Sequence, residues 1–212
     1  MNLRILTALV MAALAWGQAK KGAPAKSAQA SNKLLNPAAL TARAPDRFKA
    51  RFVTTKGEFV LSVRREWAPL GADRFYNLAS NGFYDGCAFF RVAPSYVVQF
   101  GLNPNPAIQA VWEKNPLKDE PVRHTNGIGY AAYAAAGAHT RTTQIFISMR
   151  DNKSLDVQGF SPFGDVTSGL ATLVQLYSGY GEKIDQQRVI KLGAAYLRAF
   201  PKLDSIKKVV IE

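Results

Sequence analysis

Cysteine and histidine are scarce in this 212-residue chain, which has one cysteine and two histidines. Because Cys87 stands alone, an internal disulfide and a cysteine-cluster metal site are excluded. His124 and His139 have no second histidine or carboxylate at metal-ligand spacing, so a catalytic metal is not expected. The chain also lacks a Gly-x-Ser-x-Gly elbow or another pattern of an activated nucleophile. Hydrolases and metalloenzymes are therefore poor candidates.

One segment resembles a cofactor motif, because residues 127–132 match the dinucleotide fingerprint Gly-x-Gly-x-x-Ala. That fingerprint must follow a buried strand and open a helix. Here residues 121–126 are polar, and Gly137 interrupts the Ala-rich stretch that follows. We expect no nucleotide and no other cofactor.

Acidic residues are missing from the first 45 positions, which divide into two parts. Residues 1–19 combine Arg4 with an uncharged apolar run from Ile5 to Trp16, which is too short to span a ~30 Å hydrocarbon core but typical of a signal peptide. Residues 20–45 are rich in Ala, Lys, Ser, Asn and Pro, which predicts a flexible basic linker. We expect a bacterial protein that is exported to the periplasm or secreted, without stable membrane insertion after cleavage. An uncleaved N-terminal anchor is the alternative.

The formal net charge of +12 is shared between this N-terminal part and the rest of the chain, where 21 basic residues stand against 15 acidic ones. Such a balance is typical of a solvated surface, and nucleic-acid binding is not expected. Residues 46–212 are long enough for one hydrophobic core, and we expect one domain that is a monomer.

Within 46–212, short apolar runs with period two dominate. A hairpin is predicted around Lys56-Gly57, and a helix from Pro69 to about Gly82. Two further helices are predicted, one from Leu170 to Ser178 and one over 186–200. The remaining expected strands are 88–92, 96–100, 127–133, 145–148, 163–166 and 206–211. This pattern predicts a mainly β fold, a closed antiparallel eight-stranded barrel with two or three flanking helices. Its core is expected over 51–180, followed by a C-terminal helix and closing strand over 184–212.

Three ordered motifs resemble those of the cyclophilin family. The first contains an Arg and a Gln in two β runs joined by a Pro-bearing turn, the second a Gln followed two residues later by a Phe, and the third a Leu-Asp pair before a Phe-Gly-x-Val strand. In this chain they are Phe89-Phe90-Arg91, Pro94, Tyr96, Gln99 and Gly101; then Gln144 and Phe146; then Leu155-Asp156 and Phe163 to Val166.

The resemblance implies a site for proline-containing polypeptides. Arg91 is then the catalytic side chain, and Gln99 and Gln144 are polar contacts. Ala132 is the small residue that lets the substrate backbone approach. The walls of the proline pocket are then Tyr96, Val97, Phe146 and Leu155.

Two positions depart from the family pattern. Ser154 stands where many members carry a Trp that engages the inhibitor cyclosporin, and Phe160 stands at the pocket where they carry a His. The segment after Val166 is longer than a minimal family domain, and its helix is expected to serve packing rather than function. The implied activity is peptidyl-prolyl cis/trans isomerisation without a covalent intermediate. The alternatives are a non-catalytic cyclophilin-like chaperone or proline-peptide binding module, and a structural protein of the cell envelope.

Overall fold

The computed structural model describes residues 33–212. The predicted signal peptide, residues 1–19, and the first part of the predicted linker lie outside the described residues. From Lys33 onward the linker prediction is wrong, because this segment packs on the domain. Leu34 is buried, and its carbonyl accepts a hydrogen bond of 2.8 Å from the indole Nε1 of Trp112. The backbone N–H of Ala44 donates to Asp73 Oδ1 at 2.8 Å.

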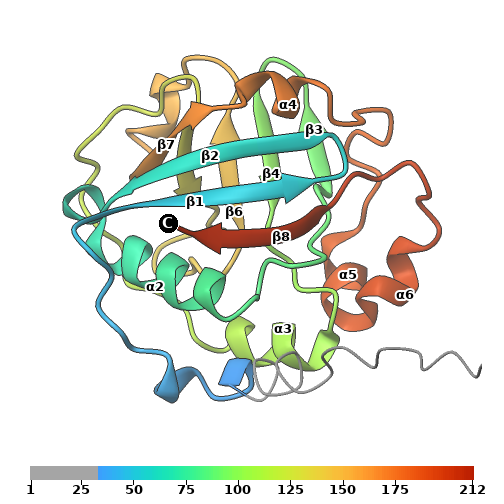
Figure 1. The fold of residues 1–212 in the computed structure, drawn as a ribbon, viewed down its shortest axis with the longest axis horizontal. Coiled ribbons are helices and arrows are strands. Elements are labelled where there is room, and N and C mark those ends of the chain that lie inside the picture. The colour runs from blue at the N-terminus through green and yellow to red at the C-terminus, as the bar shows by residue number, and fades with distance from the viewer. Residues whose placement is uncertain (1–32) are drawn as a thin grey trace, which may run out of the picture.

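Eight antiparallel strands form one curled sheet (Figure 1). The predicted hairpin is confirmed as the two longest strands, which pair along their whole length. The predicted closing strand 206–211 is also confirmed. In chain order the strands are β1 (Arg47–Thr54), β2 (Gly57–Arg64), β3 (Arg91–Ala93), β4 (Val97–Phe100), β5 (Tyr130–Tyr133), β6 (Ile145–Ser148), β7 (Pro162–Ser168) and β8 (Ile206–Ile211).

The sheet is not a closed barrel, which corrects the prediction. The strand order is β3-β4-β6-β5-β7-β2-β1-β8, so β3 and β8 are the two edges and do not pair with each other as strands. An isolated bridge between Ala88 and Ser205, and a hydrogen bond from Gly86 N to the Ile206 carbonyl, link the chain near these edges. Beyond that bridge, Phe90 packs in an apolar cluster with Ile184 and Val189 of the C-terminal segment. The helical arm therefore packs beside the β3 edge of the sheet.

Five α-helices accompany the sheet in the described residues, more than the two or three predicted. They are α2 (Pro69–Ser80), α3 (Pro106–Glu113), α4 (Leu170–Val174), α5 (Gln186–Leu192) and α6 (Ala194–Leu197). Short 3-10 turns lie at η1 (Pro37–Ala39), η2 (Arg65–Trp67) and η3 (Lys153–Leu155). No helix within residues 33–212 is long and apolar enough to cross a membrane.

Local chemistry explains the differences from the predicted helices. The first turn of α3 is capped by the Asn105 side chain, which accepts from Ala107 N. The helix predicted over 186–200 is divided by Gly193, whose φ of 54° and ψ of −135° are not helical. A side chain at Gly193 would collide with the carbonyl oxygen of Pro104, so this glycine permits a close approach of two backbones.

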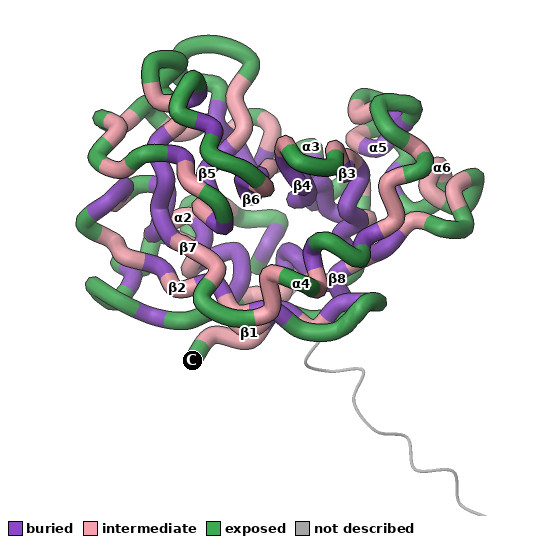
Figure 2. The backbone as a smooth tube through the Cα atoms, turned by 90° about the horizontal axis from the view of Figure 1, so that it is seen from above, coloured by how far each residue is buried: buried purple, intermediate pink, exposed green. Residues whose placement is uncertain are grey.

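Aromatic rings fill the core between the sheet and α2. Phe52 and Phe59 stack across β1 and β2 with ring centroids 4.4 Å apart, and Phe75 of α2 packs against Phe52 and Phe163. Figure 2 shows the buried strands surrounded by exposed loops, with α5 and α6 as a largely exposed arm. The main core therefore lies inside the curl of the sheet. Residues of β3, β4 and β6 also border a cleft outside this core.

Candidate functional site

A cleft of about 590 Å³ opens beside β3, β4 and β6. Eight of the nine predicted site residues line it: Arg91, Tyr96, Val97, Gln99, Gln144, Phe146, Leu155 and Phe160. The ninth, Ala132, is fully buried in the apolar cluster beneath the cleft and does not line it. The three sequence motifs thus meet at one place in the fold.

Strand register brings these residues together. Arg91 on β3 lies opposite Gln99 on β4, Gln99 lies opposite Phe146 on β6, and Phe146 lies opposite Ala132 on β5. Residues directly opposite each other in antiparallel strands project from the same face of the sheet. One row across four strands therefore supplies a cation, an amide, an aromatic ring and a small residue.

The floor of the cleft is apolar. Val97, Phe146, Leu155 and Ala132 form one buried cluster, separate from the main core. Phe160 packs edge-on against Phe146, with ring centroids 5.5 Å apart and an interplanar angle of 82°. At this position Phe160 extends the aromatic wall, so its departure from the family pattern leaves the pocket apolar.

A chain of polar side chains runs along one side of this floor. Gln99 Nε2 donates to Gln144 Oε1 at 2.9 Å, and Arg91 Nη1 lies 3.5 Å from Gln99 Oε1. The Arg91 guanidinium lies 5.6 Å from the ring centre of Tyr96. The Arg91 side chain is 29% exposed, so the cation stands at the rim of the cleft, within reach of a bound ligand.

Gly101 fixes the position of Gln144 relative to β4. Its φ is 104°, and a side chain there would collide with the carbonyl oxygen of Thr143. The hydroxyl of Thr143 in turn donates to the Gly101 carbonyl at 2.8 Å. Only glycine allows the two backbones to approach this closely, which explains the Gln-x-Gly part of the first motif.

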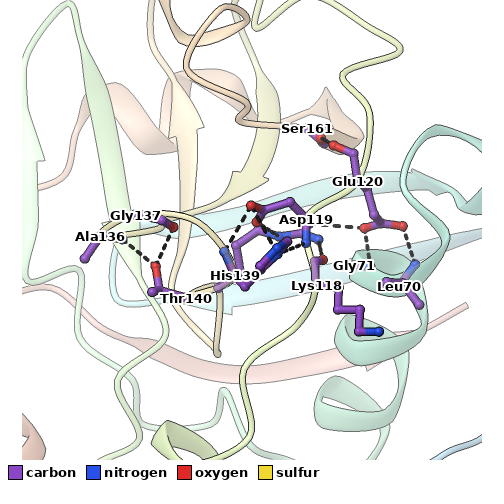
Figure 3. A network of polar contacts seen from close by, with 11 residues as sticks. Leu70, Gly71, Lys118, Asp119, Glu120, Ala136, Gly137, His139, Thr140 and Ser161 are labelled. Atoms are coloured by element: carbon purple, nitrogen blue, oxygen red, sulfur yellow. Dashed lines mark hydrogen bonds and ion pairs between the residues drawn. The ribbon is translucent and has the colours of Figure 1, made fainter.

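Another wall is the Ala-rich loop 134–140, held by a charge network that the sequence analysis missed and that has a buried Arg141–Glu120 pair (Figure 3). Arg141 is 2% exposed and its Nη1 donates to Glu120 Oε2 at 3.1 Å. Glu120 also accepts from the backbone N–H groups of Leu70 and Gly71 at the start of α2, which compensates the positive end of that helix. Asp119 N donates to His139 Nδ1 at 3.0 Å. The network ties the loop to α2.

Other lining residues also come from segments that the motifs did not mark. Glu113, Pro116, Thr142 and parts of the Ala-rich loop lie on one side. Gln186, Gln187 and Ile190 of α5 lie on the other. The C-terminal helix, expected to serve packing, thus also borders the cleft. No signal in the sequence marks these residues, because their place depends on how the arm docks.

Two further observations bear on the chemistry. No group of three or more His, Cys, Asp or Glu side chains in residues 33–212 is arranged to hold a metal ion. Burial raises the pKa of the lone thiol, Cys87, and it is fully buried in the main core. This sulfur packs as a small apolar group.

Comparison with known proteins agrees with the motifs. A family model described as "Cyclophilin type peptidyl-prolyl cis-trans isomerase/CLD" matches residues 49–193. Among curated relatives, peptidyl-prolyl cis-trans isomerase CYP65 of Arabidopsis thaliana is 31% identical over 131 residues, which are 59% of this chain and 22% of the relative. Peptidyl-prolyl cis-trans isomerase ppi1 of Schizosaccharomyces pombe is 32% identical over 121 residues, which are 56% of this chain and 77% of the relative. The chain thus matches about a fifth of the first relative and about three quarters of the second.

Solved structures show the same fold. A cyclophilin-type peptidyl-prolyl cis-trans isomerase of Cryptosporidium parvum superimposes with a TM-score of 0.57 at 19% identity, covering 78% of this chain and 98% of the other. Its structure determined in the presence of the dipeptide Ala-Pro gives a TM-score of 0.56. With a family match over most of the described domain, three motifs in order and one cleft that unites them, the chain belongs to the cyclophilin-type peptidyl-prolyl cis-trans isomerase family.

Proposed function

We propose that the protein catalyses cis/trans isomerisation of X-Pro peptide bonds in polypeptides bound at the cleft beside Arg91. The observation that carries the proposal is that one arginine lies next to a buried apolar floor. Arg91 stands at the rim, and Phe146 and Leu155 are almost fully buried beneath it. A proline ring fits the floor while the guanidinium reaches the backbone.

The reaction requires little chemistry from the protein. Rotation about the peptide bond must break amide resonance, at a barrier of ~18 to 20 kcal/mol, and no covalent bond is made or broken. In the twisted transition state the proline nitrogen regains its lone pair and becomes a hydrogen-bond acceptor. A donor aimed at that nitrogen stabilises the transition state more than the planar ground state. A guanidinium suits this task because it is always protonated and has several donors in one plane.

The polar chain has a second role in this proposal. The Gln99–Gln144 hydrogen bond fixes both amides, which leaves their remaining groups for the substrate backbone. The ring of the bound proline excludes water from the cleft, and this exclusion strengthens the polar contacts beside the floor. The Cryptosporidium structure determined with Ala-Pro supports proline-containing peptides as the substrate class.

The second candidate function is a non-catalytic binding module, for which the departures of Ser154 and Phe160 from the family pattern are the support; the position of Ser154 weakens that support. Ser154 is exposed on η3 and does not line the cleft, so this substitution leaves the floor and Arg91 unchanged. A proline-isomerisation assay on a short Ala-Pro peptide separates the two functions. Catalysis at low protein-to-peptide ratio supports the enzyme, and binding without acceleration supports the module.

We further propose that the protein acts outside the cytoplasm as a monomer, after cleavage between Gly17 and Lys20. The support is the signal-like sequence of residues 1–19. Intact mass of the protein from the extracytoplasmic fraction tests the export proposal, and full-length chain in the cytoplasm would contradict it. Sedimentation of the purified protein tests the oligomeric state.

A further inference from the structure

The guanidinium of Arg91 is held by a carboxylate that lies 91 residues away along the chain. Arg91 Nε donates to Glu182 Oε1 at 2.8 Å. Glu182 belongs to the turn before α5, whose residues Gln186 and Gln187 line the cleft. The C-terminal arm, shown at the right of Figure 1, therefore contacts the Arg91 side chain at the rim of the cleft.

The turn that carries Glu182 is anchored on both sides. Before it, the Tyr180 ring packs against Phe200, and its carbonyl accepts from Lys183 N at 3.0 Å. After it, Ile184 is buried in a cluster with Phe90, the residue that precedes Arg91 in the chain. Side-chain packing thus connects this turn to the first motif. The position of Glu182 beside Arg91 is therefore set by the packing of its neighbours in the turn.

The other contacts of Arg91 within residues 33–212 are longer. Gln99 Oε1 lies at 3.5 Å from Nη1, and the Tyr96 ring centre lies 5.6 Å from the guanidinium carbon. Glu182 alone provides a short charge-assisted hydrogen bond, the stronger type of contact. Because that bond is to Nε, it restrains the direction of the planar group and leaves the two Nη atoms for other acceptors.

We propose that Glu182 is a positioning residue for the isomerase reaction, holding the Arg91 guanidinium so that its Nη donors face the proline nitrogen. This inference rests on the proposed function. Preorganised donors contribute most when their orientation is fixed before the reaction. The pair is at the surface, with side chains 29% and 71% exposed, and exposed ion pairs contribute little to stability. The effect of Glu182 is therefore on turnover, and the melting temperature is expected to stay unchanged.

The test compares Glu182→Ala and Glu182→Gln with a matched control, Glu66→Ala. The Glu66 carboxylate, in η2, is 66% exposed and lies 3.8 Å from Nη2 of Arg47 on β1. Neither residue lines the cleft. We expect Glu182→Ala to lower kcat about three- to tenfold with KM changed less than twofold. Glu182→Gln keeps an acceptor oxygen and is expected to retain at least half of the rate. Glu66→Ala is expected to have unchanged kinetics.

A double-mutant cycle shows whether Glu182 acts through Arg91. At a raised enzyme concentration, Glu182→Ala is expected to cause no further loss in the Arg91→Ala background. The inference is overturned if Glu182→Ala keeps the full kcat, if it loses the same factor in both backgrounds, or if it is faster than the unmodified protein. A faster variant would mean that the carboxylate competes with the substrate for the guanidinium. An unmodified protein without isomerase activity contradicts the proposed function itself, which distinguishes the two failures.

Discussion

Gln99 on β4 and Gln144, the residue before β6, are joined by a hydrogen bond in which the Gln99 amide Nε2 donates to the Gln144 amide oxygen at 2.9 Å. The same Gln99 offers its own oxygen to Arg91 Nη1. One side chain thus connects the cation at the rim to the polar residue deeper in the cleft, and its removal leaves both without this partner.

We expect Gln99→Ala to lower kcat/KM about fivefold, because a hydrogen bond of this kind is worth about 1 kcal/mol and 1.4 kcal/mol corresponds to a tenfold change. Gln175→Ala is the control, since Gln175 is exposed at the end of α4 and does not line the cleft. Both variants are assayed on the same Ala-Pro peptide. Equal activity of the two variants would show that the polar chain has no part in turnover.

The second prediction concerns the inhibitor cyclosporin, which the family resemblance connects with the position of Ser154. Ser154 lacks the indole donor and the apolar face of a Trp, and interface aromatics of this type are often worth ~2 kcal/mol or more. We expect the unmodified enzyme to bind cyclosporin at least about thirtyfold more weakly than members of the family that carry the Trp.

Ser154→Trp is expected to recover part of this sensitivity. Lys153→Trp is the matched control, because Lys153 is the exposed neighbour on the same 3-10 turn. The measurement is a titration of the unmodified protein, Ser154→Trp and Lys153→Trp with cyclosporin in one isomerase assay. Tight inhibition of the unmodified protein, or equal gains from both tryptophans, would contradict the role given to position 154.

The third prediction concerns Asp73, which ties the start of the described chain to α2. Burial by itself would raise the pKa of this carboxyl, but the hydrogen bonds from Arg65 and from Ala44 N outweigh it, and the pKa is lowered. A carboxyl with a lowered pKa in the folded state stabilises the fold at pH values above its unfolded value of about 3.9. This stabilisation is lost as the pH falls through the folded pKa.

We expect Asp73→Asn to lower the free energy of unfolding at pH 7 by about 1 to 2 kcal/mol, or a few degrees in Tm. The difference from the unmodified protein is expected to shrink when the pH is lowered to about 3. Asp46→Asn is the control, because the Asp46 side chain is 79% exposed and its ion pair with Arg43 is at the surface. Thermal melts at both pH values provide the measurement. If Asp73→Asn loses the same amount of stability at both pH values, the stabilising role of the ionised Asp73 carboxylate is contradicted.

The family resemblance names the residues that the fold brings together at the floor of the cleft, and hydrophobic alternation accounts for the faces on which the strand residues lie. Val97 and Val98 divide between the cleft cluster and the main core, as a period of two requires. Tyr96 lies in the turn before β4, outside the strand pattern, and lines the cleft beside Val97. Its role was implied by the family resemblance and not by periodicity.

The parts that the sequence does not predict depend on contacts between distant segments. Glu182 contacts Arg91 beside the packing of Ile184 on Phe90, and no local sequence pattern predicts a contact between segments so far apart. The open sheet likewise depends on distant segments, since β3 and β8 are its two edges and Phe90, beside β3, packs with the arm. The helix over 186–200 is divided because Gly193 must pass close to Pro104, a constraint invisible without the fold.

The most direct measurement is the isomerase activity of Arg91→Ala beside Arg51→Ala. Arg51 is a matched control, because its Nε donates to Glu212 Oε1 at 2.7 Å and its side chain is 37% exposed, yet it lies on β1 and does not line the cleft. Loss of one preorganised donor costs ~3 to 4 kcal/mol, so Arg91→Ala is expected to lose about 10² to 10³ in kcat/KM while its Tm stays within a few degrees. Arg51→Ala is expected to keep its activity. An Arg91→Ala protein that retains more than about half of the unmodified rate would contradict the central claim, because even a tenfold loss requires only ~1.4 kcal/mol.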